Sequence, residues 1–194
     1  IIEQDKLFVL YDPILNIHQI NKMKREKLKV DNKKYFLAAG RLTKQKNFEF
    51  LIEAYDKFIM KSGRLLFIAG DGEELQNLKN LILKKKIEKK VFLIGFKDNI
   101  YNYMKNCEAF ILSSLWEDPG FVLIEAAFCR ANIISSNCKN GPIEFIENNR
   151  CGFGFKNNSL EDFEKQFNIF LNSRKKFLIQ RKINALTKIK KFTN

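Results

Sequence analysis

Residues 35–60 read YFLAAGRLTKQKNFEFLIEAYDKFIM: an apolar run, a glycine turn and then a helical pattern. Residues 35–39 carry no charge and do not alternate with polar residues, which is typical of a strand buried on both faces. From residue 48 to residue 60, apolar side chains recur at helical spacing, which predicts a helix with one buried face. A strand joined closely to an amphipathic helix is the unit from which parallel sheets are built.

The same unit recurs along the middle of the chain. Further strand-like runs occupy residues 65–69, 91–94, 109–112 and 132–135, and helical patterns occupy residues 74–86, 100–106, 121–129 and 160–171. Strands that alternate with helices form a parallel sheet with helices on both faces, because each crossover carries its helix onto the sheet. The sequence therefore predicts an α/β fold with an open parallel sheet.

Length and composition fit a single folded unit with short additions at its ends. The chain has 194 residues, of which 45% are hydrophobic, enough for a core and too many for a disordered protein. No apolar run is long enough to cross a bilayer. Because the chain opens on IIEQDK, which is neither a signal peptide nor a natural start, we expect a piece of a longer protein. We divide it into an inter-domain segment with a first strand (7–10) and a helix (1–34), a main domain (35–172) and a basic C-terminal helix (173–194).

The cysteine and histidine content limits the possible chemistry. The two closest of the four cysteines, Cys129 and Cys138, are nine positions apart, so no zinc-binding CxxC pair exists. We interpret the cysteines as free thiols in a reducing compartment. His18 is the only histidine, which excludes a Ser-His-Asp triad or a multi-histidine metal site elsewhere in the chain. These counts therefore exclude a zinc site built on cysteine pairs and a site built on several histidines.

The formal net charge of +13 is concentrated in two segments. Residues 22–34 carry +5 and residues 173–194 carry +8, so the rest of the chain is neutral overall. A basic balance favours an anionic partner, such as nucleic acid or an anionic membrane. A chain rich in Lys, Asn, Ile and Phe is also typical of an AT-rich genome, so both interpretations of the charge stay open at this point.

The basic C-terminal segment also has a pattern of apolar residues. Apolar side chains recur at helical spacing in an otherwise basic segment, at Ile179, Ile183, Leu186, Ile189 and Phe192. Such a seam predicts packing against another part of the protein. The alternative is that the helix lies on anionic lipid.

The loops that follow the strands hold the candidate binding residues, because ligands of open parallel sheets bind at the carboxyl ends of the strands. The first strand is followed by Gly40, Arg41 and, five positions on, Lys46. With Asn47 as the expected N-cap, the two cations flank the start of a helix, where free N–H groups attract anions. An anion such as a diphosphate would bridge them. The alternative is a solvated cationic loop.

Glu125 is the second candidate. We expect its helix to begin with Asp118 as the cap and Pro119 in the first turn, and to carry otherwise apolar side chains to residue 129. An ionised carboxylate about two turns into a buried helix needs a partner. Ribose hydroxyls would serve, and so would backbone groups or a nearby Arg or Lys. Glu117 lies in the preceding loop; paired acids also serve glycoside hydrolysis, but nothing marks either acid as the proton donor.

Together these features resemble the donor-binding half of retaining glycosyltransferases of family 4, which have the GT-B fold. The family's motifs stand in order over roughly residues 35–171, as Gly40-Arg41-Leu42 with Lys46, Gly70-Asp71-Gly72, Gly95-Phe96, Ser113-Ser114 with Glu117 and Glu125, and Gly141-Pro142-Ile143-Glu144 through Gly152-Phe153-Gly154. Each motif alone is common, whereas five in register are specific. One departure is that residues 117–121 read EDPGF, where the family often has EGF.

The resemblance implies a Rossmann-like open parallel sheet, one half of a GT-B enzyme, and a role for each matching residue. The cations would neutralise a nucleotide diphosphate, Glu125 would accept hydrogen bonds from ribose, and the region of Phe96 would face the base. Glu117 and the backbone of Gly120 and Phe121 would hold the transferred sugar. The implied catalytic residues are Arg41, Lys46 and Glu117. The implied donor-binding set is Gly40, Arg41, Lys46, Gly70, Gly72, Phe96, Glu117, Gly120, Phe121, Val122 and Glu125.

The resemblance also implies partners. The substrate would be a nucleotide sugar, a UDP-sugar in our interpretation, without a metal or cofactor. The acceptor, a glycan or a lipid-linked glycan of the bacterial surface, would bind through the missing N-terminal half. The enzyme would be cytoplasmic, with contact to the anionic inner face of the membrane, and would not bind nucleic acid. The alternatives are a non-catalytic nucleotide-binding module, a basic nucleic-acid-binding domain and a sugar phosphorylase.

Overall fold

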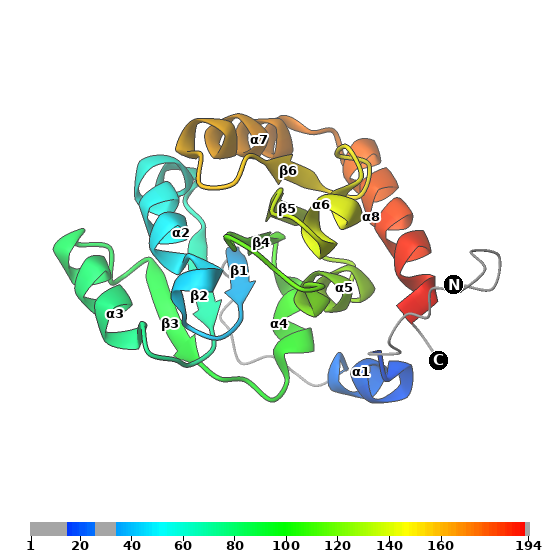
Figure 1. Ribbon diagram of the computed structural model, residues 1–194, viewed down its shortest axis with the longest axis horizontal. Helices are drawn as coiled ribbons and strands as arrows, with labels where there is room; N and C mark the ends of the chain where they lie inside the picture. Colours follow the sequence, from blue (N-terminus) through cyan, green and yellow to red (C-terminus); the bar gives the residue numbers. More distant parts are fainter. Residues whose placement is uncertain (1–14, 26–33, 193–194) are drawn as a thin grey trace, which may run out of the picture.

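The computed structural model describes residues 15–25 and 34–192 of the chain. The strand expected at residues 7–10 lies outside these residues. The described part forms one six-stranded sheet in the order β3-β2-β1-β4-β5-β6, and each neighbouring pair of strands is parallel (Figure 1). The predicted Rossmann-like parallel sheet is confirmed.

Five of the six strands coincide with the predicted apolar runs to within one residue. The strands are β1 Tyr35–Ala39, β2 Leu65–Ala69, β3 Val91–Gly95, β4 Ala109–Leu112, β5 Ile133–Ser136 and β6 Phe153–Phe155. The edge strand β6 was not predicted, because its three residues include a glycine and are too few for a periodic pattern.

Eight α-helices precede, connect or follow the strands in the described residues. They are α1 Ile17–Met23, α2 Phe48–Ala54, α3 Leu75–Lys84, α4 Ile100–Asn106, α5 Phe121–Phe128, α6 Gly141–Ile146, α7 Leu160–Asn172 and α8 Lys175–Ile189. The helix expected over residues 48–60 is α-helical only in its first half. It continues as a π-helical turn, Tyr55–Ile59, and a 3-10 turn, Met60–Ser62.

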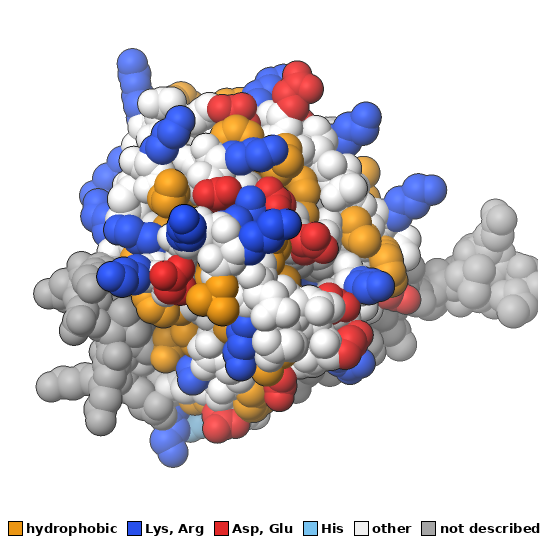
Figure 2. Space-filling model, turned by 90° about the vertical axis from the view of Figure 1, so that its left-hand side faces the viewer, with side chains coloured by type: hydrophobic (Ala, Val, Ile, Leu, Met, Phe, Trp, Pro, Cys, Tyr) orange, Lys and Arg blue, Asp and Glu red, His pale blue; other side chains and the backbone are white. Residues whose placement is uncertain are grey.

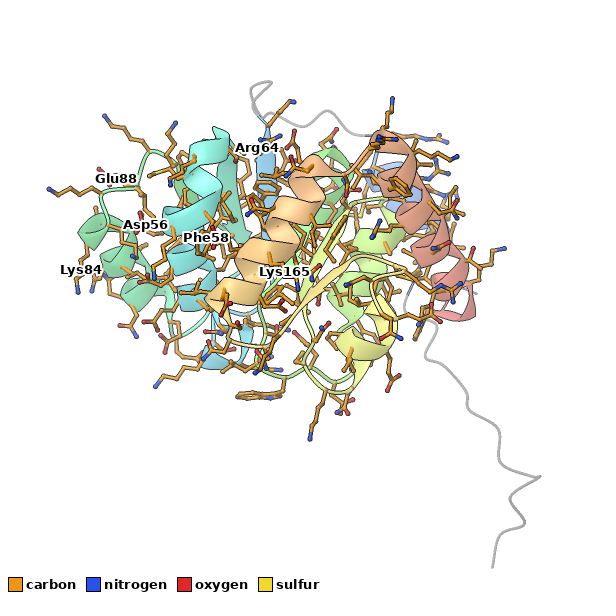
Figure 3. The ribbon with its side chains drawn as sticks, turned by 90° about the horizontal axis from the view of Figure 1, so that it is seen from above. Asp56, Phe58, Arg64, Lys84, Glu88 and Lys165 are labelled. Carbon is orange, nitrogen blue, oxygen red and sulfur yellow. The ribbon has the colours of Figure 1, made fainter. Side chains whose placement is uncertain are left out.

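One face of the sheet is covered by α2, α3 and α7. Alternate side chains of β1, including Phe36, point into this layer, where Phe163, Phe167 and Phe170 of α7 join them. Figure 3 shows α2 and α7 side by side above the sheet. Next to them, Asp56 forms an ion pair with Lys85 at the end of α3 (2.9 Å).

The opposite face is covered by α1, α4, α5, α6 and α8, against the other side chains of β1. The helix α8 packs on its own domain through Ala185 and Ile189, both buried. Its Arg181 lies over the ring of Phe153 at 4.5 Å. Two residues of the predicted apolar seam, Ile179 and Ile183, are 47% and 49% exposed, so what this part of the seam packs against stays a prediction.

The surface charge is mixed on the face formed by α2 and α3. Figure 2 shows lysine and arginine side chains interspersed there with acidic and apolar ones. No helix within the described residues combines the length and the apolar character that crossing a bilayer requires. The four cysteines are buried and form no disulfide.

Candidate donor-binding cleft

A cleft of about 620 Å³ opens at the carboxyl ends of β1, β2 and β3, between these strand ends and the helices α4 and α5. Its lining residues are Ala39, Gly40, Arg41, Ala69, Gly70, Asp71, Phe96, Lys97, Ile100, Met104, Val122 and Glu125. Six of them belong to the predicted binding set, namely Gly40, Arg41, Gly70, Phe96, Val122 and Glu125. The strand-end rule for open parallel sheets therefore located the cleft correctly.

The cleft is lined at its base by the close backbone of two glycine turns. The Gly40 N–H donates to the Ala69 carbonyl (3.0 Å), and the Gly70 N–H donates to the Gly95 carbonyl (3.0 Å). At Gly70 the backbone has a φ of +141°, and a Cβ atom would lie 1.9 Å from the Gly40 carbonyl oxygen. Glycine is required here, because any other residue would separate the two turns.

Arg41 contributes an exposed cation to the cleft and forms no ion pair within the described residues. Its loop is held by a hydrogen bond from the Leu42 N–H to the Asp71 carbonyl (2.8 Å). The expected helix start is confirmed in position, since α2 begins at Phe48 with Asn47 as its N-cap residue, but the details differ. A 3-10 turn, Lys44–Lys46, precedes α2, and Asn47 has a φ of 52° and makes no capping hydrogen bond with its side chain. Arg41 is thus a loop cation rather than a cation at a helix N-terminus.

Lys46 occupies a different environment from Arg41. Its Nζ lies 2.6 Å from Glu117 Oε1, and the two side chains are only 15% and 5% exposed. The same carboxylate oxygen accepts a hydrogen bond from the Ser114 hydroxyl. The Lys46 side chain passes over Gly40, where an added Cβ would meet its Cε at 3.1 Å. The charge of Lys46 is therefore paired beneath the cleft, whereas that of Arg41 is not.

The loop that carries Glu117 is fixed by hydrogen bonds to the Lys46 loop. The Ser113 hydroxyl donates to the Lys46 carbonyl (2.8 Å), and the Leu115 N–H donates to the Gln45 carbonyl (2.8 Å). The Gln45 side-chain amide donates in turn to the Trp116 carbonyl (3.0 Å). The Lys46–Glu117 pair thus has a rigid frame, which holds both side chains in one geometry.

The helix α5 begins later than the sequence suggested. It starts at Phe121, after Gly120 with a φ of 81°, so Asp118 and Pro119 belong to the preceding loop and do not start the helix. Glu125 is therefore the fifth residue of α5, about one turn from its start rather than two. The helix is also not enclosed on all sides, because Val122 and Glu125 face the cleft.

Glu125 has a partner that the sequence did not reveal. The Tyr101 hydroxyl of α4 donates to Glu125 Oε1 at 3.0 Å. Burial raises the pKa of the Glu125 carboxyl, and the hydrogen bond from Tyr101 opposes this rise. Burial, followed by the nearby Glu125 charge, also raises the pKa of Tyr101, so the phenol remains a donor. No local pattern marks Tyr101, because its role depends on α4 packing beside α5.

Five residues of the predicted binding set lie outside the cleft lining: Lys46 and Glu117, which form the ion pair described above, and Gly72, Gly120 and Phe121. Gly72 fits against the Leu42 backbone, where a Cβ would lie 2.5 Å from the carbonyl oxygen. A Cβ at Gly120 would lie 3.4 Å from Glu117 Cβ, so this residue adjoins the buried ion pair. Phe121 begins α5 and is 36% exposed. The described residues contain no group of three or more metal-ligating side chains placed to hold an ion.

The family model for glycosyl transferases group 1 matches residues 19–185, so the chain belongs to this family of glycosyltransferases. It is 34% identical over 151 residues to the N-acetylgalactosamine-N,N'-diacetylbacillosaminyl-diphospho-undecaprenol 4-alpha-N-acetylgalactosaminyltransferase of Campylobacter jejuni, covering 78% of this chain and 40% of that protein. It is also 34% identical over 137 residues to the amylovoran biosynthesis glycosyltransferase AmsD of Erwinia amylovora, covering 71% of this chain and 38% of that protein.

Among solved structures, the fold is similar to that of Anabaena HepE in complex with UDP-glucose. The TM-score is 0.77 at 21% identity, over 95% of this chain and 52% of that one. The chain thus spans about two fifths of the two curated relatives and about half of this structure. The prediction of a glycosyltransferase domain with the GT-B type of fold is confirmed.

Proposed function

We propose that the chain is the donor-binding half of a retaining family 4 glycosyltransferase, which transfers a hexose or N-acetylhexosamine from a UDP-sugar to a bacterial surface glycan. The observation that carries this proposal is the cleft at the strand ends. Its lining includes Arg41, which has no ion pair in the part of the chain that the structure describes, and the desolvated Glu125. Family membership and the likeness to a UDP-glucose complex support a nucleotide sugar as the ligand.

In this proposal each part of the cleft binds one part of the donor. The glycine turns at Gly40 and Gly70 let the backbone approach the diphosphate closely, and Arg41 supplies its positive charge. Glu125 accepts hydrogen bonds from the ribose hydroxyls. The ring of Phe96, 73% exposed, lies against the base. Val122 and the backbone of Gly72 complete the donor-binding set.

The sugar-transfer chemistry places charge on both sides of the breaking bond. The bond between the anomeric carbon and the β-phosphate oxygen breaks, and the acceptor hydroxyl oxygen forms the new bond and loses its proton. Negative charge grows on the diphosphate, where Arg41 and Lys46 stabilise it. Glu117, with the backbone of Gly120 and Phe121, holds the sugar and fixes the position of Lys46. We propose retention of the anomeric configuration on the family resemblance alone.

The acceptor and the location are further parts of the proposal. The name of the Campylobacter relative includes a diphospho-undecaprenol carrier, which supports a lipid-linked acceptor bound by a second half of the enzyme. The basic helix α8, in the segment 173–194 that follows the donor domain 35–172, would face the missing half or anionic lipid at the cytoplasmic face of the membrane. A nucleic acid is not expected as a partner.

The test is a thermal-shift series with UDP, UDP-glucose, UDP-N-acetylglucosamine, GDP-mannose and phosphate. A donor present at 100 times its Kd should add about 2.7 kcal/mol of stability, and Arg41→Ala should abolish the shift, whereas Lys44→Ala should retain it. If no nucleotide sugar stabilises the chain, the donor-binding proposal is wrong. If nucleotides bind but the longer enzyme shows no turnover, the chain is a non-catalytic nucleotide-binding module instead.

A further inference from the structure

Two adjacent helices, α4 and α5, contribute to the wall of the cleft. At the start of α4, the Asn99 side chain accepts a hydrogen bond from the Asn102 N–H (3.2 Å), which fixes the first turn. Ile100 and Met104 of the same helix line the cleft. Tyr101 extends from this fixed turn to the carboxylate of Glu125 on α5.

The hydrogen bond engages only one of the two carboxylate oxygens. Tyr101 donates to Oε1, and Oε2 accepts no hydrogen bond from the described residues. Glu125 also has no salt bridge with the described part of the chain, in contrast to Glu117. Its carboxylate is therefore held at one oxygen and retains acceptor capacity for a ligand.

A phenol suits this position better than a cation. A Lys or Arg partner would cancel the charge of Glu125, whereas a phenol orients the carboxylate and leaves its charge in place. Burial and the neighbouring carboxylate raise the pKa of Tyr101, so the hydroxyl keeps its proton over the range in which Glu125 is ionised. The phenol can therefore donate to the ionised carboxylate without neutralising it.

We infer that Tyr101 is a positioning residue, whose hydroxyl fixes the Glu125 carboxylate in the orientation that accepts the ribose hydroxyls of the donor. This inference rests on the proposed nucleotide-sugar site. It assigns to α4 a part in ribose recognition that the motifs of the sequence do not include. Without the hydroxyl, the carboxylate would have no fixed rotamer and would take up a proton more readily.

The experiment is calorimetric titration of the 194-residue chain and of Tyr101→Phe with UDP and with 2′,3′-dideoxyuridine diphosphate, which lacks both ribose hydroxyls. Tyr101→Phe should weaken UDP binding roughly three- to tenfold, as one hydrogen bond does, and should leave the dideoxy analogue within about twofold. Because the ratio of the two affinities is taken within each variant, it does not depend on the fraction of folded protein. Tyr103→Phe, on the same helix, is the control, since its hydroxyl has no hydrogen bond within the described chain.

The pH profile supplies a second readout. Affinity for UDP should decline on acidification as Glu125 becomes protonated, and in Tyr101→Phe the decline should begin at a higher pH. Equal losses for both ligands would reveal a merely structural role and overturn the inference, and so would an unchanged or tighter affinity for UDP. If the wild-type chain does not bind UDP, the proposed function itself fails.

Discussion

Two carboxylates eight positions apart, Glu117 and Glu125, occupy opposite kinds of environment. Glu117 is 5% exposed and has a lysine at 2.6 Å and a serine hydroxyl as partners. Glu125 lines an open cleft, and among residues 15–25 and 34–192 its only hydrogen-bond partner is the Tyr101 hydroxyl. The protein thus satisfies the first acid with its own groups and leaves acceptor capacity on the second, which is the property expected of a ligand-binding residue.

The difference also has an energetic side. A buried ion pair is held by the mutual attraction of its members, and removing one of them leaves an uncompensated charge. Burial of Glu125, by contrast, raises its pKa, so its ionised form is maintained at a cost to stability. We therefore expect changes at Glu117 to act first on stability and changes at Glu125 to act first on binding.

The largest effect on stability should come from Glu117→Gln. This change leaves the ammonium of Lys46, 15% exposed, without its counter-charge, and should lower the free energy of unfolding by about 3 kcal/mol. Urea denaturation at pH 7 measures the loss. Glu73→Gln, at an exposed acid, is the matched control and should change stability by less than about 0.5 kcal/mol. A loss of similar size in both variants would remove the distinction between the two acids.

Arg41→Ala tests the groups that line the cleft, in contrast to the buried Lys46–Glu117 pair. In the longer enzyme, turnover should fall about 10²–10³-fold, as when a preorganised donor to a developing anion is removed. Stability should stay near the wild-type value, because Arg41 has no ion pair within the described residues. Steady-state kinetics with Lys44→Ala as the control measures the effect. A rate close to wild type for Arg41→Ala would contradict the assignment.

Glu125→Ala should weaken UDP binding by about 1.5–3 kcal/mol, the usual contribution of hydrogen bonds to a charged group. Calorimetry of the chain at pH 8, where the carboxylate is ionised, is the direct measurement. Glu73→Ala controls for the loss of one negative charge from the domain. Identical affinities for Glu125→Ala and wild type would refute the ribose role.

The smallest effect is a gain in stability from Glu125→Gln. The folded-state pKa of Glu125 lies above its unfolded value, so ionisation lowers stability as the pH rises from the unfolded pKa through the folded one. Glu125→Gln should therefore be more stable by roughly 0.5–1 kcal/mol at pH 8. This advantage should be largely lost near pH 4, where the carboxyl is mostly protonated in both states. Urea denaturation of both proteins at the two pH values measures the difference in their free energies of unfolding and its sign.

The sheet was predictable because its strands are continuous apolar runs, and the cleft was predictable because loops at strand ends converge. Local sequence patterns did not predict the features of the site that depend on tertiary contacts or on an unusual backbone conformation. The Lys46–Glu117 pair joins loops 71 positions apart, and no spacing rule connects them. Asp118 and Pro119 were predicted to start the helix. Gly120 has a positive φ, which is not helical, so α5 begins only at Phe121. The proposed roles of the individual site residues stay predictions until binding is measured.

The contact between Gly40 and Gly70 has a consequence for how ligand preference can diverge. The two turns are in contact through main-chain atoms. A side chain at Gly70 would therefore change the floor of the cleft only by separating the ends of β1 and β2. Adaptation to a new nucleotide would have to proceed at the rim, where Phe96 and Lys97 contribute side chains that can be exchanged. Related chains that bind nucleotides with different nucleobases should therefore share Gly40 and Gly70 and differ at positions 96 and 97.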